Sequence, residues 1–204
     1  MAQLPQQWKG KTVIVAASGP SLAGLAPMIL KRNCDGVPSI AVNTSFRLIE
    51  NADVLFAGDL QWWKFHYKEI GTRGFRGALW TIDHAATRYP GVQRVKAVHR
   101  PGIGVEHIYS NGNSGMQAVN LAFLFGSRRV LLAGFDMKLG PEGEKHWHAD
   151  HPHPMVQGQQ FGEWIHKANF VAADAKRLGL EIINCTPGSA LTMFPMSTLE
   201  KELA

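Results

Sequence analysis

Cysteine is scarce in this sequence, and long apolar runs are absent. The two cysteines, Cys34 and Cys185, lie far apart along the chain, which argues against a disulfide framework and predicts free thiols. No apolar run approaches the roughly 18 residues that a membrane-spanning helix needs. The residues before the first apolar run also lack the hydrophobic core of a signal peptide. We therefore expect a soluble, cytoplasmic protein with no membrane partner.

Blocks of like charge, internal repeats and low-complexity segments are missing as well. The chain has 204 residues, of which 45% are hydrophobic, and this is enough to bury one substantial core. We expect a single domain over residues 1–204. The formal net charge of +5 suits anionic partners such as nucleotides or nucleic acid. Because the basic residues are scattered, the charge gives little support to nucleic acid.

The stretch TVIVAASGPS, at residues 12–21, is the feature around which we interpret the chain. An apolar, β-branched run precedes a turn of small residues, and a helical pattern covers residues 22–31. Such a corner binds phosphate, because glycine lets the backbone approach a ligand and a helix N-terminus points unpaired N–H groups at it. We expect Ser21 to cap this helix. The turn residues predicted to bind a phosphate-bearing cofactor, such as a nucleotide, are Ser18, Gly19, Pro20 and Ser21.

Further apolar runs end in polar residues, as the first one does. The runs at 38–43, 53–59 and 129–136 each close on an amide or a carboxylate. Apolar strands that alternate with helices indicate a parallel sheet covered on both faces. We predict an α/β fold with a Rossmann-like, mostly parallel sheet, which binds its ligand beyond the carboxyl ends of the strands. The other residues predicted to bind the cofactor at that edge are Asn43, Thr44, Asp59, Asn113, Ser114, Gly115 and Asp136.

The remaining elements follow from apolar periodicity and from turn residues. Further strands are expected at 78–82, 94–98 and 181–184, with a helical turn at 83–89. Further helices are expected at 60–70, 114–125 and 159–178. The segment 99–113 is expected to be a loop, and residues 185–195 a closing loop that folds back on the site. Trp164 and Phe170 are expected in the core.

A lid-like loop is expected at residues 137–157, which are too rich in glycine, proline and histidine for regular structure. Its four histidines are His146, His148, His151 and His153. They allow three interpretations, namely a general base, a transition-metal site or a solvated loop. No cysteine partner or HExxH spacing accompanies them, so we assign no metal ligand.

An ordered set of motifs resembles one known superfamily. The motifs are SGPSL (18–22), AVNTSF (41–46), NSGMQAVNLAFLFG (113–126), VLLAGFD (130–136) and NCTPGSAL (184–191). In this order, with a histidine-bearing loop before a long helix, they resemble bacterial sialyltransferases and the related MptE-like 6-hydroxymethylpterin diphosphokinases of archaea. They also resemble phage or prophage proteins similar to either. The resemblance covers most of the chain.

The sialyltransferase resemblance implies a nucleotide-sugar donor such as a CMP-sugar, and a glycan or small-molecule acceptor. It also implies that a histidine of the lid-like loop takes the proton from the acceptor hydroxyl. The candidates for this base are His148 and His151. By position, the residues that would hold the CMP part are Gly19, Pro20, Ser21, Asn43, Thr44, Ser114 and Gly115.

Two departures from the sialyltransferase pattern leave alternatives open. Those enzymes support the leaving phosphate with tyrosines, but no tyrosine follows Tyr109 here, so Lys138 or Lys145 would neutralise the phosphate instead. They usually carry an asparagine where Asp59 stands, and Asp59 with Asp136 would suit Mg²⁺ on a triphosphate. That favours an ATP-dependent diphosphokinase as the second interpretation. The third is a non-catalytic phage accessory protein that keeps the nucleotide pocket.

Overall fold

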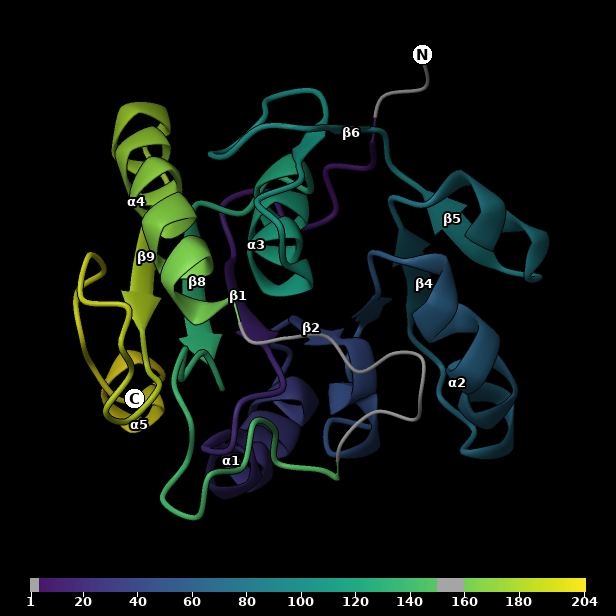
Figure 1. Ribbon diagram of the computed structural model, residues 1–204, viewed down its shortest axis with the longest axis horizontal. Helices are drawn as coiled ribbons and strands as arrows, with labels where there is room; N and C mark the ends of the chain where they lie inside the picture. The colour runs from purple at the N-terminus through teal and green to yellow at the C-terminus, as the bar shows by residue number, and fades with distance from the viewer. Residues whose placement is uncertain (1–3, 150–159) are drawn as a thin grey trace.

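Figure 1 shows the computed structural model of the chain, which describes residues 4–149 and 160–204. The strands of its main sheet are β1 (Thr12–Ala16), β2 (Ser39–Val42), β3 (Val54–Phe56), β4 (Ala78–Thr81), β5 (Val92–Arg94), β8 (Arg129–Ala133) and β9 (Glu181–Asn184). All are parallel, in the order β5-β4-β3-β2-β1-β8-β9. The chain builds the sheet outward from β1 to β5 and then places β8 and β9 on the other side of β1. The predicted Rossmann-like α/β fold is confirmed.

The helices cover both faces of this sheet. They are α1 (Leu22–Cys34), α2 (Leu60–Thr72), α3 (Ser114–Leu124), α4 (Phe161–Leu178) and α5 (Leu199–Glu202). In β1, Val13 and Val15 pack in a core with α3 and α4, whereas Ile14 and Ala16 pack in a second core with α1 and α2. Accordingly, α3 and α4 lie on the opposite side of the strands from α1 in Figure 1. Burial on both faces explains why the strands are apolar throughout.

The region between β4 and α3 differs from the prediction. The strand expected at 94–98 is two short strands, β5 and β6 (Ala97–Val98), because the chain leaves the main sheet after Arg94. Strand β6 pairs in parallel with β7 (Ile108–Tyr109), within the segment expected to be a loop. The helical turn between β4 and β5 is a 3₁₀ helix. Strands of two residues with a distant partner leave no periodicity in the sequence.

Two buried asparagines fix the segment between β6 and α3. The side-chain oxygen of Asn120, on α3, accepts from the backbone N–H groups of Gly104 and Tyr109 at 2.9 Å each, and its nitrogen donates to the Gly104 carbonyl at 2.8 Å. Asn111 exchanges two hydrogen bonds with Gly102 in the same way. The segment is therefore anchored against α3 although it holds little regular secondary structure.

The closing loop at 185–195 folds back on the end of β8, as expected. The Ser189 hydroxyl donates to the Phe135 carbonyl at 2.6 Å, and the Ala190 N–H donates to the Asp136 carbonyl at 2.9 Å. These hydrogen bonds fix the backbone of the residues that follow β8, where the chain leaves the sheet.

Both cysteines are free, as predicted: Cys34 is exposed and Cys185 is buried. Burial raises the pKa of the Cys185 thiol to about 12, so this thiol is unreactive at neutral pH. Within the described residues, no helix has the length and apolar character that crossing a bilayer requires.

Candidate functional site

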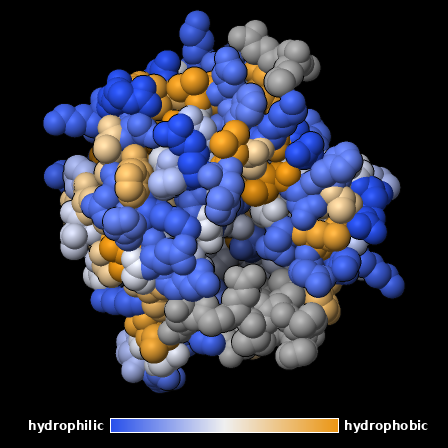
Figure 2. Space-filling view, turned by 45° about the horizontal axis from the view of Figure 1, so that its top comes forward, coloured by the Kyte–Doolittle hydropathy of each residue, from blue (hydrophilic) through white to orange (hydrophobic). Residues whose placement is uncertain are grey.

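A cavity of about 610 Å³ lies at the carboxyl ends of β1, β2, β3, β4 and β8. The sheet order reverses between β1 and β8, which is where open α/β sheets bind their ligands. Figure 2 shows a face of the molecule that is hollowed near its centre, with mostly hydrophilic side chains around the hollow. The predicted site residues that line the cavity are Ser18, Gly19, Asn43, Asp59, Asn113, Ser114, Gly115, Asp136 and Lys138.

The remaining predicted site residues lie elsewhere. Those that do not border the cavity, as far as the chain is described, are Pro20, Ser21, Thr44 and His148. Thr44 is buried, and its hydroxyl accepts a hydrogen bond from the Trp62 indole at 3.2 Å. Thr44 thus supports a cavity wall from behind. His151 and His153 lie outside the described residues.

The turn after β1 is held by hydrogen bonds within the protein. The Gly19 N–H donates to the Gly134 carbonyl at 2.9 Å. Ser21 donates to Asp136 twice, from its N–H at 3.2 Å and from its hydroxyl at 2.8 Å. Ser21 is the N-cap residue of α1, as predicted, but its side chain makes no capping hydrogen bond. The Asp136 carboxylate accepts from Ser21 at the N-terminal end of this helix instead. The N–H groups of Gly19, Ser21 and Leu22 are therefore already engaged within the protein, and Pro20 has no N–H to offer.

The two carboxylates predicted to hold Mg²⁺ both have other partners. Asp136 is 8% exposed, and burial raises its pKa against the hydrogen bonds from Ser21 that lower it. Asp59 caps α2, since one of its oxygens accepts from the Trp62 N–H at 3.0 Å. Among the described residues, no group of three or more His, Cys, Asp or Glu side chains could hold a metal ion. Within the described part of the chain, the two carboxylates therefore belong to no ready-made metal cluster.

Buried polar atoms without a hydrogen-bond partner are concentrated around the cavity. Among the described residues that line it, these atoms are Asn43 Oδ1, Asn113 Nδ2, Gln117 Oε1 and Trp164 Nε1. A buried polar group left unpaired costs roughly 1–3 kcal/mol, and such groups are rare in folded proteins. Four of them at one cavity indicate a surface that is completed by a polar ligand.

Two residues at strand ends adopt a left-handed backbone that side chains disfavour. Asn43, after β2, has φ 52°, and Met137, after the β8 turn, has φ 51°. Both line the cavity. Backbone strain of this kind costs of order 1–3 kcal/mol and clusters at functional sites. It therefore agrees with a binding site at this edge of the sheet.

Among the described residues, two histidines line the cavity, and the predicted base His148 is not one of them. His146 and His99 line it, from the lid-like loop and from the end of β6 respectively. His99 lies 3.4 Å from the Ser110 hydroxyl. Burial lowers the pKa of His148 to about 4, and its Nδ1 lies 2.6 Å from the Ala149 carbonyl, so this imidazole is neutral at pH 7.

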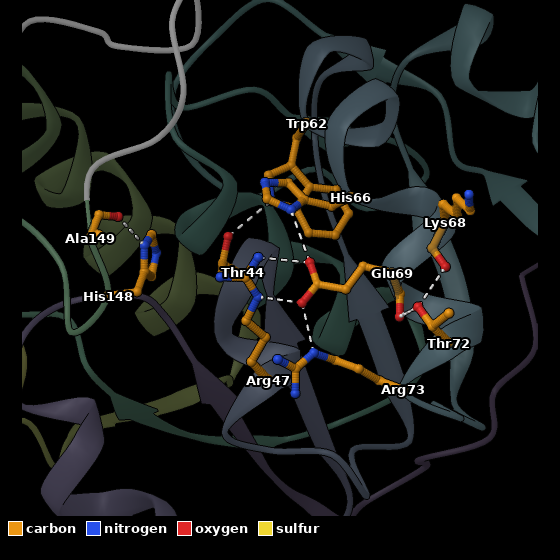
Figure 3. A network of polar contacts seen from close by, with 10 residues as sticks. All are labelled: Thr44, Arg47, Trp62, His66, Lys68, Glu69, Thr72, Arg73, His148 and Ala149. Carbon is orange, nitrogen blue, oxygen red and sulfur yellow. Dashed lines mark hydrogen bonds and ion pairs between the residues drawn. The ribbon is translucent and has the colours of Figure 1, made fainter.

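A polar network lies behind the cavity wall that Trp62 forms (Figure 3). Arg47 makes a bidentate ion pair with Glu69, with both distances 2.7 Å, and Arg73 donates to the same carboxylate at 2.7 Å. His66 also contacts Glu69, at 3.4 Å, and its ring lies 4.9 Å from that of Trp62. Burial by itself raises the pKa of Glu69, but the two arginines outweigh it and lower the pKa to about 2.

The Glu69 network predicts how the free energy of unfolding depends on pH. Because the pKa of Glu69 is depressed from 4.5 to about 2 on folding, its contribution is complete above pH 4.5 and is lost as the pH falls toward 2. We expect Glu69→Gln to lower the free energy of unfolding by about 2 kcal/mol at pH 7, after allowance for solvent screening. Urea denaturation at pH 7, 4 and 3 should show this difference shrinking.

The matched control is Glu163→Gln, which removes an exposed ion pair with Lys167 on α4. It should change the free energy of unfolding by less than about 0.5 kcal/mol at each pH. A difference between wild type and Glu69→Gln that stays constant from pH 7 to pH 3 would contradict the assignment.

Several cavity residues escaped the sequence analysis. They are Gln117, His99, Phe161 and Trp164. Gln117 had a detectable signal, because Gln117 and Asn120 are the polar side chains that interrupt the apolar run of this helix. Trp164 borders the cavity rather than the core, and Phe170, also expected in the core, is 46% exposed. Both residues lie on α4. The amphipathic pattern of this helix predicts which face is apolar, but it does not predict which residue borders a cavity.

Comparison with known proteins shows a structural similarity. No protein-family model matches the chain, and no curated protein sequence matches it. The chain is similar to the solved structure of the MAf glycosyltransferase from Magnetospirillum magneticum AMB-1, with a TM-score of 0.64 and 15% identity. The match covers 97% of this chain and 35% of that one. At this level of identity the similarity establishes a shared fold.

Proposed function

We propose that this chain is the nucleotide-binding unit of a glycosyltransferase that uses a nucleotide-sugar donor. The concentration of unpartnered polar atoms in the cavity at the sheet's switch point carries the proposal. A nucleotide offers the hydrogen-bonding groups that would satisfy those atoms. The name of the protein with the shared fold, a glycosyltransferase, supports the choice of glycosyl transfer as the reaction class. Because this chain spans only 35% of that protein, acceptor recognition is not assigned to it alone.

Lysines would stabilise the departing phosphate in this proposal. The N–H groups of Gly19, Ser21 and Leu22 are engaged within the protein, so we assign the positive charge to side chains. Lys138 and Lys145 both line the cavity. As the sugar–oxygen bond to the phosphate breaks and the acceptor hydroxyl attacks, an ammonium group would balance the charge that develops. The general base for that hydroxyl stays a prediction, with His148 and His151 as its candidates.

The diphosphokinase alternative stays a prediction. It requires Mg²⁺, and the carboxylates of Asp59 and Asp136 already serve the backbone of α2 and of the turn after β1. A non-catalytic accessory protein with a nucleotide pocket stays open as the third alternative. Binding measurements separate the three.

Calorimetric titration with CMP, CDP, UDP, GDP and ATP, each with and without Mg²⁺, tests the proposal. We expect a nucleotide monophosphate or diphosphate to bind without Mg²⁺. Binding of ATP alone, and only with Mg²⁺, would favour diphosphoryl transfer. The absence of binding by all of these nucleotides would overturn the proposed function.

Charge removal at the cavity provides the corresponding prediction. We expect Lys145→Ala to weaken nucleotide binding about tenfold, since a hydrogen bond to a charged group contributes roughly 1.5 kcal/mol. The matched control is Lys176→Ala, in the last turn of α4, which should leave the affinity unchanged. An equal loss in both variants would mean that only the net charge of the protein matters.

A further inference from the structure

Gln117, in the first turn of α3, carries a hydrogen-bond acceptor whose identity is fixed. Its Nε2 donates to the Ser110 carbonyl at 2.6 Å, and a carbonyl only accepts. The side-chain amide is therefore oriented by the backbone, and Oε1 is the atom that is left over. That oxygen is buried and has no hydrogen-bond partner among the described residues, on a side chain that lines the cavity and is 6% exposed.

Asn113 carries a donor that is fixed in the same way. Its Oδ1 caps α3 by accepting from the Met116 N–H at 2.9 Å, and an N–H only donates. Its Nδ2 is then the atom left over, and this nitrogen is likewise buried without a partner among the described residues. Asn113 thus offers one donor from a residue that lines the same cavity.

The donor and the acceptor both come from the N-terminal end of α3. Asn113 is the N-cap residue, Gln117 follows in the first turn, and both line the cavity. Gly58, after β3, lies against both this turn and Gln117: a Cβ there would be 2.5 Å from Gln117 Oε1 and 3.1 Å from Ser114 Oγ. Trp62 and Ile82 add apolar surface to the lining. A flat polar ring fits such a setting.

We propose that Asn113 and Gln117 read the base of the bound nucleotide by an amidine edge, an amino group beside an unprotonated ring nitrogen. The amino group donates to Gln117 Oε1, and the ring nitrogen accepts from Asn113 Nδ2. Cytosine and adenine present this edge. Uracil and hypoxanthine present a carbonyl beside a ring N–H, which would set acceptor against acceptor and donor against donor. The inference rests on the proposed function and names its base class.

Titration with two matched pairs of nucleotides tests this directly. CMP and UMP differ only at this edge, where an amino group beside a ring nitrogen becomes an oxo group beside a ring N–H, and AMP and IMP differ in the same way. We expect at least tenfold tighter binding of the amino member in one pair, and the pair that shows it identifies the base. Equal binding within both pairs would overturn the inference while leaving the proposed function intact. If none of the four binds, the proposed function fails and the inference fails with it.

Asn113→Asp is the decisive variant, because it keeps the capping oxygen and replaces only the donor Nδ2 by an acceptor. We expect the ratio of amino to oxo affinity to fall at least tenfold, since the ring N–H of uracil or hypoxanthine would then meet an acceptor. Asn169→Asp, on the exposed surface of α4, adds the same charge and should leave the ratio unchanged. An unchanged ratio in Asn113→Asp would overturn the assignment, and a circular dichroism spectrum equal to that of wild type establishes that the variant is folded.

Discussion

Gly19→Ala should lower the free energy of unfolding by about 3 kcal/mol and abolish nucleotide binding. A Cβ at this position would lie 2.6 Å from the Gly134 carbonyl oxygen and 2.8 Å from Asp136 Cγ. The Gly134 atom is a main-chain carbonyl oxygen just after β8, and the Asp136 side chain is hydrogen-bonded to Ser21. Neither neighbour can therefore move without a loss of stability. The methyl group would push apart the strand ends that form the cavity.

Gly24→Ala is the matched control for this effect. Gly24 lies in α1, a few residues beyond the turn, and a Cβ there meets nothing within 4 Å. Since alanine is a better helix former than glycine, this variant should gain roughly 0.5–1 kcal/mol. Urea denaturation of both variants measures the difference. Similar stability of the two would mean that the close approach of β1 and β8 at Gly19 is not required.

Asn120→Ala should produce a loss of about 3–5 kcal/mol in the free energy of unfolding. Asn120 is fully buried, and its removal leaves the N–H groups of Gly104 and Tyr109 and the Gly104 carbonyl without partners. Each unpaired buried group costs roughly 1–3 kcal/mol. The segment it holds carries His99, Ser110 and other residues of one cavity wall, so nucleotide affinity should fall as well.

Asn169→Ala is the matched control, because it removes an exposed asparagine where Asn120→Ala removes a buried one. Asn169 is exposed on α4, and its side chain donates only to carbonyls of its own helix, those of Ile165 and His166. Its replacement should change the free energy of unfolding by less than about 0.5 kcal/mol. Slow hydrogen exchange of the Gly104 and Tyr109 amides in wild type provides a measurement that does not depend on a folded variant. Fast exchange at both would contradict the anchoring role.

The sequence by itself determined the fold class and most of the elements. Apolar strands that alternate with helices require burial on both faces, and this property is local enough to be visible without coordinates. It gave β9 at its observed bounds, and it gave α3 to within one residue of its observed end. It also located the polar residues at the carboxyl edge of the sheet, because parallel strands bring all their carboxyl ends to one side.

Only the tertiary structure decided which of those polar residues face the cavity and what each one does. Asp59 and Asp136 look alike in the sequence, yet one caps a helix and the other holds the turn after β1. The roles of Asn120 and Gln117 depend on backbone groups of the segment before α3, and that segment has no periodic pattern to predict its path. Hydrogen bonds between residues distant in sequence are set by how the elements pack, and packing is not encoded in any single stretch of the chain.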